Sequence, residues 1–462
     1  MILNPHTLDA YDLLHKGILA LARAEMQGLR IDMDYIEKKK KHLAHKVDTL
    51  ESSFKQTNFF RHWQHTVKGS ININSNLQLS HYLYKIKGIK IEKETTSGLG
   101  STDDEALRQM QIPELNDLLE IRKFKKLQGY LDLFEREQVD GYLHPFFNLH
   151  LVSTFRSSSD HPNFQNIPKR DEESMQTCRR ALYPRPGHQL MEIDTSGMEV
   201  RIAACYHKDT TMLKYITEPT SDLHGDMTQQ IFILDKFDKK LPEHYVLRQA
   251  TKNGFVFPEF YGDYYKNCAI GLVCNWGKLP QGVWKPGQGI AMPEGTLSDH
   301  LISKGIRSLD SFTTHLQKIE ADFWGKRFKE YADWKETWIS LYKKYGYVDL
   351  LSGFRCSGVM DRKQVINYPV QGAAFHCLLW SLNHIDEVMV REKWDTKIIG
   401  QIHDSILFDC LPEEIPHVVE VVKRVMTKDL LEEWKWIIIP IEIDCEISEI
   451  DGSWAEKHSM KI

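Results

Sequence analysis

Apolar positions recur at helical spacing through the first part of the chain. Residues 8–44 follow this pattern, and Gly28 interrupts it shortly before Asp32, which predicts a turn and a new helix cap. A long charged helix is then expected over residues 32–58, and a second one over 114–137. Two long charged helices around a small polar tip indicate a protruding lobe.

Farther along the chain, shorter alternating runs typical of strands appear. We expect a strand or hairpin arm over 142–152, a strand over 189–194, and a hairpin over 397–408 that carries His403 and Asp404 in its turn. Helical patterns separate these strands and predict helices over 196–206, 243–257, 312–345 and 370–390.

Proline and glycine mark the interruptions. Pro258 is expected to end the helix over 243–257, because proline cannot donate the backbone hydrogen bond that continues a helix. Residues 275–310 are rich in Gly and Pro and predict an inserted loop.

Composition narrows the class of protein. The chain has 462 residues, 42% hydrophobic and 27% charged, which allows two or three domains of an ordinary soluble protein. No apolar run could span a membrane and the N-terminus lacks a secretory signal pattern, so we expect neither membrane contact nor secretion. The eight cysteines form no Cys-x-x-Cys pair, which favours reduced thiols in a cytosolic protein. The net charge of −5 counts mildly against nucleic-acid binding, although basic residues cluster at 38–41, 122–126, 169–170 and 179–180.

Two aspartates stand at the ends of strand-like runs. Asp194 ends the run over 189–194, and Asp404 lies in the expected hairpin turn. Separate strands that bring two carboxylates to one place would suit a pair of divalent cations. The segment after Asp194 also has a second interpretation, because Ser196 and Glu199 have the spacing of a helix capping box.

A cationic and aromatic pattern follows in the middle of the chain. Arg248 and Lys252 are four positions apart and would share one helix face, where they could hold a triphosphate. Alone, such a pair more often marks an exposed cationic face. Phe257 and Tyr261 follow closely, and a cationic face that runs into an aromatic patch suits a nucleotide.

Two further segments look like loops when taken alone. Thr154–Pro168 is turn-rich, and Asn367–Gly372 has the form of a proline turn before a helix. Together and in this order, the segments resemble the polymerase region of family A DNA polymerases, the bacterial DNA polymerase I type. The primer-template segment, motif A, motif B, the Asn-x-Pro-x-Gln-Gly block and motif C correspond to Thr154–Pro168, Glu192–Arg201, Arg248–Gly262, Asn367–Gly372 and Gln401–Ser405. The resemblance spans nearly the whole chain and also includes 77–109, 222–224 and 442–454.

The resemblance implies an α+β fold shaped as a right-hand polymerase, whose palm carries an antiparallel sheet and whose fingers and thumb are helical. The implied parts are an N-terminal helical segment joining the palm (1–29), the thumb (30–140), a first palm part (141–215), the fingers with an insertion near 275–310 (216–349) and a second palm part (350–462).

The resemblance also implies site residues. Asp194 and Asp404 would bind two Mg²⁺ ions, for which Mn²⁺ could substitute, and the Thr195 carbonyl would be a further ligand. The residues implied in contacts with primer and template are Arg156, Gln165, Asn166, Lys363, Asn367, Gln371 and His403.

A third implied group would bind the incoming nucleotide, namely His224, Arg248, Lys252, Phe257, Tyr261 and Glu199. Lys252 would also act as general acid toward pyrophosphate, and Glu199 would be the steric gate against a ribose 2′-hydroxyl. Phe257 is assigned to the nucleobase, while Val256 and Phe255 remain open for that role.

The sequence departs from the family pattern in four places. Lys252 to Tyr261 is one residue longer than expected, with Pro258 inside it. Motif C ends in Ser405, so the family's third carboxylate is a hydroxyl here. Lys363 stands where the family often has arginine, and the 275–310 insertion has no counterpart.

The sequence therefore predicts a template-directed DNA polymerase acting on primer-template DNA and dNTPs by two-metal nucleotidyl transfer. No upstream stretch could hold a 3′–5′ exonuclease, so we expect a polymerase module alone. The cytoplasm of a bacterial or phage-infected cell, or the nucleoid, is the expected location. A separate exonuclease, a helicase and other replication proteins remain open as partners. Two alternatives remain: a single-subunit RNA polymerase, which also uses a His-Asp-Ser motif C, and an inactive DNA-binding scaffold.

Overall fold

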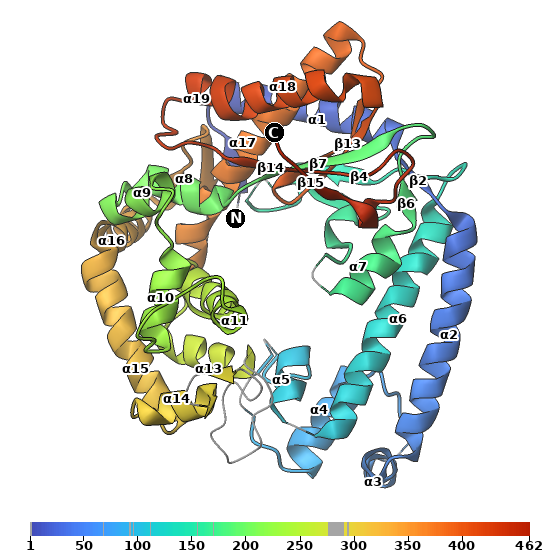
Figure 1. Cartoon of the computed structure of the whole chain (residues 1–462), viewed down its shortest axis with the longest axis vertical. Helices are drawn as coiled ribbons and strands as arrows, with labels where there is room; N and C mark the ends of the chain where they lie inside the picture. Colours follow the sequence, from blue (N-terminus) through green and yellow to red (C-terminus); the bar gives the residue numbers. More distant parts are fainter. Residues whose placement is uncertain are drawn as a thin grey trace. The chain divides into compact units, whose positions relative to one another are not determined.

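The structure is a computed structural model that describes residues 2–67, 69–91, 94–95, 97–110, 112–154, 156–169, 171–275, 291–292 and 295–462 (Figure 1). Much of the expected inserted loop, at 276–290 and 293–294, lies outside the described residues. The chain forms two compact units. Unit 1 is Met1–Lys40, Gly129–Ser221 and Trp324–Ile462, and unit 2 is Lys41–Gln128 and Asp222–Phe323.

The largest described sheet belongs to unit 1. It has five antiparallel strands in the order β12 (Lys397–Ile402), β13 (Ser405–Cys410), β7 (Gln189–Thr195), β14 (Ile443–Ile447) and β15 (His458–Met460). The strand expected over 189–194 and the hairpin expected over 397–408 are therefore confirmed. The smaller sheets of unit 1 are β1 (Ile2–Pro5) with β11 (Phe354–Ser357) and β10 (Tyr347–Asp349), β3 (Tyr142–Leu143) with β2 (Leu29–Ile31) and β6 (Leu182–Tyr183), and β4 (Phe146–Asn148) with β5 (Ser158–Asp160).

Helices pack around these sheets. Those that lie wholly in unit 1 are α1 (Leu8–Gln27), α7 (Glu172–Arg179), α8 (Met198–His207), α9 (Thr210–Thr217), α16 (Lys329–Tyr345), α17 (Arg362–Glu392), α18 (Ile415–Arg424), α19 (Leu430–Glu433), the 3-10 turns η2 (Phe164–Asn166), η5 (Pro412–Glu414) and η7 (Trp454–Glu456), and the π-turn η6 (Val425–Asp429). Three further elements cross a boundary between the units: α2 (Met33–Gln56), α6 (Pro113–Glu137) and the π-turn η4 (Phe323–Arg327).

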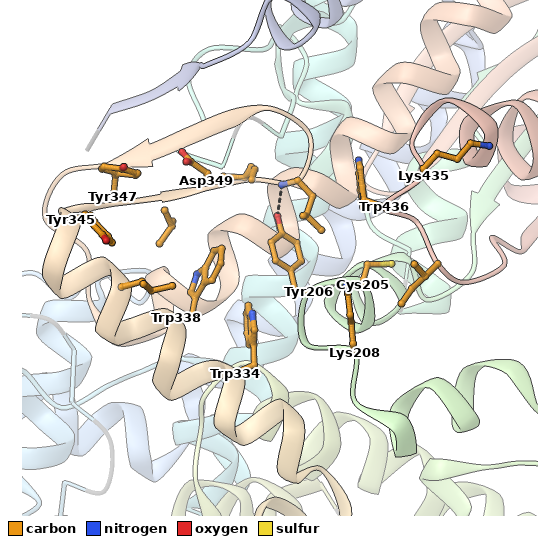
Figure 2. A pocket seen from close by; sticks show the side chains of 15 residues that line it. Cys205, Tyr206, Lys208, Trp334, Trp338, Tyr345, Tyr347, Asp349, Lys435 and Trp436 are labelled. Carbon is orange, nitrogen blue, oxygen red and sulfur yellow. Dashed lines mark hydrogen bonds between the residues drawn. The ribbon is translucent and has the colours of Figure 1, made fainter.

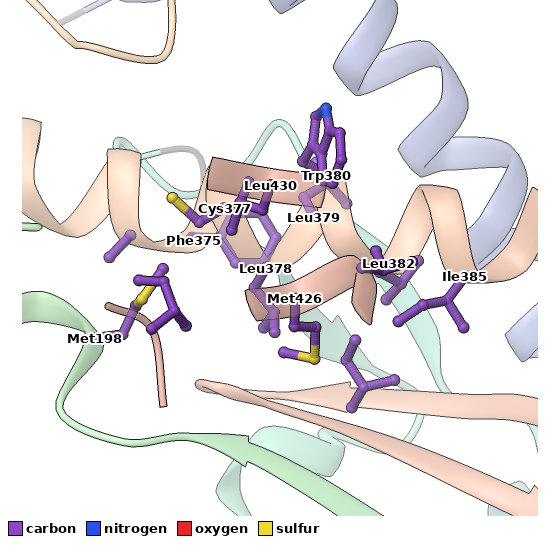
Figure 3. Packing of buried hydrophobic residues seen from close by; sticks show 14 of the residues in the cluster. Met198, Phe375, Cys377, Leu378, Leu379, Trp380, Leu382, Ile385, Met426 and Leu430 are labelled. Atoms are coloured by element: carbon purple, nitrogen blue, oxygen red, sulfur yellow. The ribbon is translucent and has the colours of Figure 1, made fainter. Parts of the chain in front are cut away.

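Helix α17 is the central element of the unit 1 core. It contacts α1, α8 and α16, and its apolar side chains pack with Met198 of α8 and with Met426 and Leu430 (Figure 3). Burying each large apolar side chain contributes roughly 1.5–3 kcal/mol. This core holds α8 in place directly after strand β7.

Pro369 lies inside α17, so the proline turn expected over Asn367–Gly372 is wrong. Proline cannot donate to the carbonyl four residues earlier, which belongs to Val365. The Trp338 indole donates to that carbonyl at 3.0 Å instead. A tertiary hydrogen bond thus satisfies the acceptor that the proline leaves open, and the helix continues.

The Tyr206 hydroxyl ties α8 to the same region. It donates to the Pro369 carbonyl at 3.2 Å and accepts from the Leu351 amide at 3.0 Å, and Figure 2 shows the second bond. Tyr206 also lines an open cavity of about 620 Å³ whose aromatic walls include Trp334 and Trp338. The hydroxyl is used for structure, since both of its partners are backbone groups.

Unit 2 has its own core, in which Phe54, Trp63 and Tyr82 are buried. Its helices are α3 (Asn58–Thr66), α4 (Asn76–Ser80), α5 (Asp104–Gln109), α10 (Leu223–Ile231), α11 (Pro242–Thr251), α12 (Phe257–Phe260), α13 (Tyr265–Asn275), α14 (Leu297–Ser303) and α15 (Leu309–Asp322), with π-turns η1 (His81–Ile86) and η3 (Lys252–Val256) and strands β8 (Ala291–Met292) and β9 (Gly295–Thr296).

Several expected elements differ in extent from those observed. The single helix expected over 312–345 is interrupted between η4 and α16, because the backbone leaves the helical region at Phe328 (φ −121°, ψ 50°), whereas α15 continues into η4. The run over 142–152 gives only the short strands β3 and β4. The expected cap at Asp32 is confirmed, since its carboxylate accepts from the Tyr35 amide at 2.9 Å.

The expectations about membrane spans and cysteines can be compared with the described part of the chain. None of the described helices is long and apolar enough to cross a membrane. The cysteines whose side chains are described form no disulfide and are buried.

Gly372 allows α17 to approach two neighbouring segments closely. A Cβ there would lie 2.8 Å from the Thr154 carbonyl oxygen and 2.7 Å from Leu350 Cδ2. We expect Gly372→Ala to lower the free energy of unfolding by about 1–3 kcal/mol, as overpacking does. Urea and thermal unfolding would measure the loss.

The matched control is Gly129→Ala on α6, where an added Cβ meets no heavy atom within 4 Å. This substitution should be neutral or stabilising by about 0.5–1 kcal/mol, because alanine favours helix. Equal stability of the two variants would contradict the close approach at Gly372.

Candidate active site

The pairing of β13 with β7 brings the two predicted aspartates together. Ser405 lies opposite Asp194 in this antiparallel pair, and Asp404 immediately precedes Ser405 in the hairpin turn. The Thr195 amide and hydroxyl both donate to the Asp404 carbonyl, at 3.1 and 3.0 Å. Backbone pairing therefore fixes the end of one strand against the turn of the other.

Gln401 holds the hairpin turn in place. Its amide donates to the His403 carbonyl at 2.5 Å, and its oxygen accepts from Gln165 at 3.2 Å and from the Ser157 hydroxyl. His403 has a positive φ of 52°, a conformation that non-glycine residues seldom adopt. The buried amide network offsets that cost and links the turn to the loop that contains Gln165.

The turn after Asp194 differs from the capping box that the sequence suggested. The N-cap of α8 is Gly197 in the left-handed conformation (φ 61°), with no side-chain cap, so the Ser196 cap is wrong. The Ser196 amide pairs instead with the Glu442 carbonyl at 2.9 Å, and Arg201 donates to the Ser196 carbonyl at 2.8 Å. Strand pairing therefore continues to Ser196, and the Ser196 side chain does not cap α8.

Cations and anions alternate around the aspartates. Arg156 Nη1 lies 3.1 Å from Glu199 Oε1, and its Nη2 lies 3.5 Å from Asp404 Oδ1. Lys169 Nζ lies 3.6 Å from Asp194 Oδ2. Glu199 therefore points to Arg156 at the carboxylate pair rather than back to the start of its own helix.

Crowding of carboxylates alters their proton affinity. Burial raises the pKa of Asp404 to about 6, and the carboxylates of Glu199 and Asp194 add to the rise. Burial also raises the pKa of Asp194. Burial lowers the pKa of His403, with a contribution from the nearby Arg156, so its imidazole is neutral near pH 7.

The donor set fits a hard divalent cation. Burial and neighbouring carboxylates raise the pKa of both aspartates, which favours a bound cation, and oxygen is the ligand that Mg²⁺ and Mn²⁺ prefer. Among the described residues, no group of three or more His, Cys, Asp or Glu side chains is arranged to hold a metal ion. The carboxylates of Asp194 and Asp404 are thus the ligands that the structure offers, together with main-chain oxygen.

The remaining predicted residues of unit 1 lie on α17 and on the 154–168 segment. Lys363, Asn367 and Gln371 are spaced four apart on α17 and therefore share one helix face. Gln165 and Asn166 lie in the 3-10 turn η2, and the Asn166 carbonyl accepts from Tyr130 at 2.6 Å. Asp194, Glu199, Asp404 and Arg156 come together, and Lys363, Asn367 and Gln371 follow one face of α17.

Within unit 2, Arg248 is held by a bidentate ion pair. Its Nε and Nη2 each lie 2.8 Å from one Asp222 oxygen. Asp222 also caps α10 by accepting from the Gly225 amide at 3.0 Å. A helix cap therefore fixes the orientation of this guanidinium, which has further donors available.

His224 and Lys252 lie against the ring of Phe257. The His224 and Phe257 centroids are 5.7 Å apart, and Lys252 Nζ lies 5.2 Å from the Phe257 centroid. Burial lowers the pKa of His224 to about 4, aided by Arg248 and Lys252. The buried His224 Nδ1 has no hydrogen-bond partner among the described residues.

A π-turn accounts for the extra residue in motif B. The Phe257 amide donates to the Lys252 carbonyl, five positions earlier, so η3 holds one more residue than an α-helical turn would. The helix then continues through Pro258 to Phe260, so the expected end at Pro258 is wrong. Of the three aromatic or apolar candidates, Phe255 and Val256 are fully buried, whereas Phe257 is partly exposed beside Lys252.

Sequence reasoning missed the supporting side chains of this site. The resemblance assigns no role to Gln401, although it lies inside motif C, and includes Asp222 only as part of a similar segment. Glu192 also received none, although an acid inside an apolar strand was a visible signal. Lys169 was recognised only as part of a basic cluster.

This chain is similar to known proteins in sequence and in fold. The family described as DNA polymerase family A matches residues 33–268 and 306–456. DNA polymerase I of Chloroflexus aurantiacus is 24% identical over 451 residues, covering 93% of this chain and 42% of the relative. DNA polymerase I of Aquifex aeolicus is 27% identical over 435 residues, covering 93% of this chain and 65% of the relative. The chain thus spans less than two thirds of the length of these curated relatives.

A solved structure has the same fold. The POL domain of Pol1 from M. smegmatis, in complex with DNA primer-template and dNTP, superposes with a TM-score of 0.73 at 22% identity, covering 96% of this chain and 70% of that chain. This likeness confirms the α+β polymerase fold class. Because the family match covers most of the sequence, including the segments that carry Asp194 and Asp404, the chain belongs to DNA polymerase family A.

Proposed function

We propose that this protein is a template-directed DNA polymerase that adds dNTPs to the 3′-hydroxyl of a primer. The observation that supports this most is the strand pairing that sets Asp194 beside Asp404 in a chain of family A. The M. smegmatis relative is in complex with primer-template and dNTP, and we propose the same substrates here.

Divalent ions are the proposed cofactor, with Mg²⁺ as the main ion and Mn²⁺ as a substitute. Asp194, Asp404 and the Thr195 carbonyl would hold two of them. Bound there, the ions would lower the pKa of the attacking hydroxyl and neutralise charge on the triphosphate. We call these three groups the metal site.

Unit 2 residues would bind the nucleotide. Arg248 would contact the triphosphate through the donors that Asp222 leaves available, and Lys252 would donate a proton toward pyrophosphate. His224 would donate or accept one hydrogen bond as a neutral imidazole, since its pKa is lowered to about 4. The Phe257 ring beside Lys252, with Tyr261 one turn later, would stack on the nucleobase.

Unit 1 residues would select the sugar and hold the DNA. Glu199, fixed by Arg156, would occupy the space of a ribose 2′-hydroxyl. The side chains proposed to contact primer and template are Arg156, Gln165, Asn166, Lys363, Asn367, Gln371 and His403. Most of them are amides or cations, which suit backbone and minor-groove contacts.

The domain assignment remains part of this proposal. The thumb would cover 30–140, the palm 141–215 and 350–462, and the fingers 216–349. We also propose a bacterial or phage-infected cytoplasm or the nucleoid as the location, and replication proteins such as a helicase or a separate exonuclease as partners.

Asp404→Asn should retain DNA binding and lose primer extension by about a thousandfold or more, because an amide cannot replace a metal-binding carboxylate. A primer-extension assay with dNTPs and Mg²⁺, alongside a DNA-binding assay, would measure both. Asp140→Asn is the control, since Asp140 is exposed and its φ of 53° suits asparagine equally. Near-normal extension by Asp404→Asn would reject the proposed site.

Glu199→Ala should lower the preference for dNTP over rNTP by about tenfold or more, because the space for a 2′-hydroxyl opens. Single-nucleotide incorporation with both substrates on one primed template measures the ratio. Glu199→Gln keeps the size and loses the charge, so it should retain the preference. A strong rNTP preference in the unaltered protein would favour an RNA polymerase instead.

Binding of a divalent ion should weaken on acidification. The pKa of Asp404 lies near 6, above its usual value, so protons compete with the ion once the pH falls below about 6. We expect Mn²⁺ affinity without DNA to be about tenfold lower at pH 5 than at pH 8. Electron paramagnetic resonance of free Mn²⁺ measures this, and an affinity that is constant over that range would contradict the assignment of Asp404.

A further inference from the structure

Glu192 is a buried acid within the strand that carries Asp194. It lies on β7 two residues before Asp194, so both side chains point to the same face of the sheet. Its side chain is only 3% exposed. A carboxylate in such a place requires partners, because an unpaired buried charge is costly.

One carboxylate oxygen of Glu192 is anchored by the C-terminal segment and α7. Oε2 accepts from the Trp454 indole at 3.0 Å and pairs with Lys457 Nζ. Arg179 Nη1 lies 3.9 Å from Oε2, and its guanidinium stacks 4.0 Å above the Trp454 ring. The Lys457 and Arg179 side chains are each 5% exposed, so this is a buried charge cluster.

The other oxygen is directed to Ser405 and Lys169, which adjoin the metal site. Oε1 accepts from the Ser405 hydroxyl at 3.0 Å, and Ser405 directly follows Asp404 and lies opposite Asp194. Lys169 Nζ lies 3.7 Å from Glu192 Oε1 and 3.6 Å from Asp194 Oδ2. The carboxylate thus has one structural oxygen and one oxygen that faces the site.

We propose that Glu192, on β7, supplies a third negative charge to the metal site, in place of the carboxylate that Ser405 lacks in motif C. Through its contacts with Lys169 and Ser405, it also positions Asp194 and Asp404. The inference rests on the proposed function. An ion pair needed only for stability would be satisfied at Oε2 by Lys457 and Arg179. The contacts at Oε1 have no such explanation, since Ser405 is neutral and Lys169 is shared with Asp194.

The two positions are therefore coupled. A carboxylate introduced at position 405 would lie against Glu192 Oε1, and two buried carboxylates in contact cannot both ionise readily. Conversely, loss of the Glu192 carboxylate would remove the buried counter-ion of Arg179 and Lys457, and Lys457 would keep the more exposed Glu446 carboxylate, 2.8 Å away. We therefore expect this place to hold one carboxylate, either at position 192 on β7 or at position 405 on β13.

The test is a double-mutant cycle of Glu192→Ser, Ser405→Glu and the exchange variant with both substitutions. Mn²⁺ affinity without DNA is the main readout, and kcat and KM for dNTP are measured beside it. Each single variant should lose about tenfold or more in Mn²⁺ affinity, the usual effect of removing a group that orients metal ligands. The exchange variant should recover to within about threefold of the unaltered protein, since it restores the charge count on the other strand. Losses that multiply in the exchange variant would overturn the proposal.

A second variant separates positioning from folding. Glu192→Gln keeps the shape and removes the charge, and circular dichroism establishes whether it is folded. Folded Glu192→Gln should bind Mn²⁺ about tenfold more weakly and raise the metal concentration needed for extension. Unchanged Mn²⁺ affinity in that folded variant would show a purely structural role.

If Glu192→Gln does not fold, Lys457→Met is added to it, because the buried Lys457 ammonium would otherwise have to rely on the more exposed Glu446 carboxylate, 2.8 Å away. Weak Mn²⁺ binding by this folded double variant supports the proposal, and unaltered binding overturns it.

Mn²⁺ affinity does not depend on polymerase activity. An unaltered protein that never extends a primer would therefore reject the proposed function, whereas an additive cycle in an active protein rejects only the role of Glu192.

Discussion

The antiparallel pairing of β13 with β7 determines where the carboxylates of the site meet. It sets Ser405 opposite Asp194 and places the Asp404 carbonyl against the Thr195 amide and hydroxyl. A slip of one residue would turn the side chain of Asp194 to the other face of the sheet. The amide network of Gln401 and the glycine turn into α8 depend on this register, since both begin where the paired strands end.

Bringing carboxylates together has an electrostatic cost, and the protein offsets it with neighbouring cations. Arg156 lies between Glu199 and Asp404, and Lys169 contacts Asp194. Such pairs are strongest where solvent is partly excluded. The site therefore combines negative charge with nearby positive charge.

The parts of the fold predicted from sequence were those with a strong local pattern. Alternation predicted the hairpin that carries Asp404, whereas Pro369 was misread because the donor that compensates for it, Trp338, comes from another helix. The Ser196 cap failed for a similar reason, since strand pairing competes for its backbone. Glu192 was missed because its partners Ser405 and Lys457 lie 213 and 265 positions away. The resemblance to the family indicates which residue types occur and in which order. Contacts between residues more than two hundred positions apart depend on the fold.

The π-turn at Lys252–Val256 has a consequence for how this helix can vary. One extra residue without an extra turn rotates the side chains before the bulge, relative to those after it, by about 100°. The directions of the side chains before the π-turn and after it therefore follow two separate α-helical repeats, which meet at the π-turn. The helix therefore keeps the Lys252 and Phe257 side chains in contact through their directions around the helix axis, and the number of residues between them matters less.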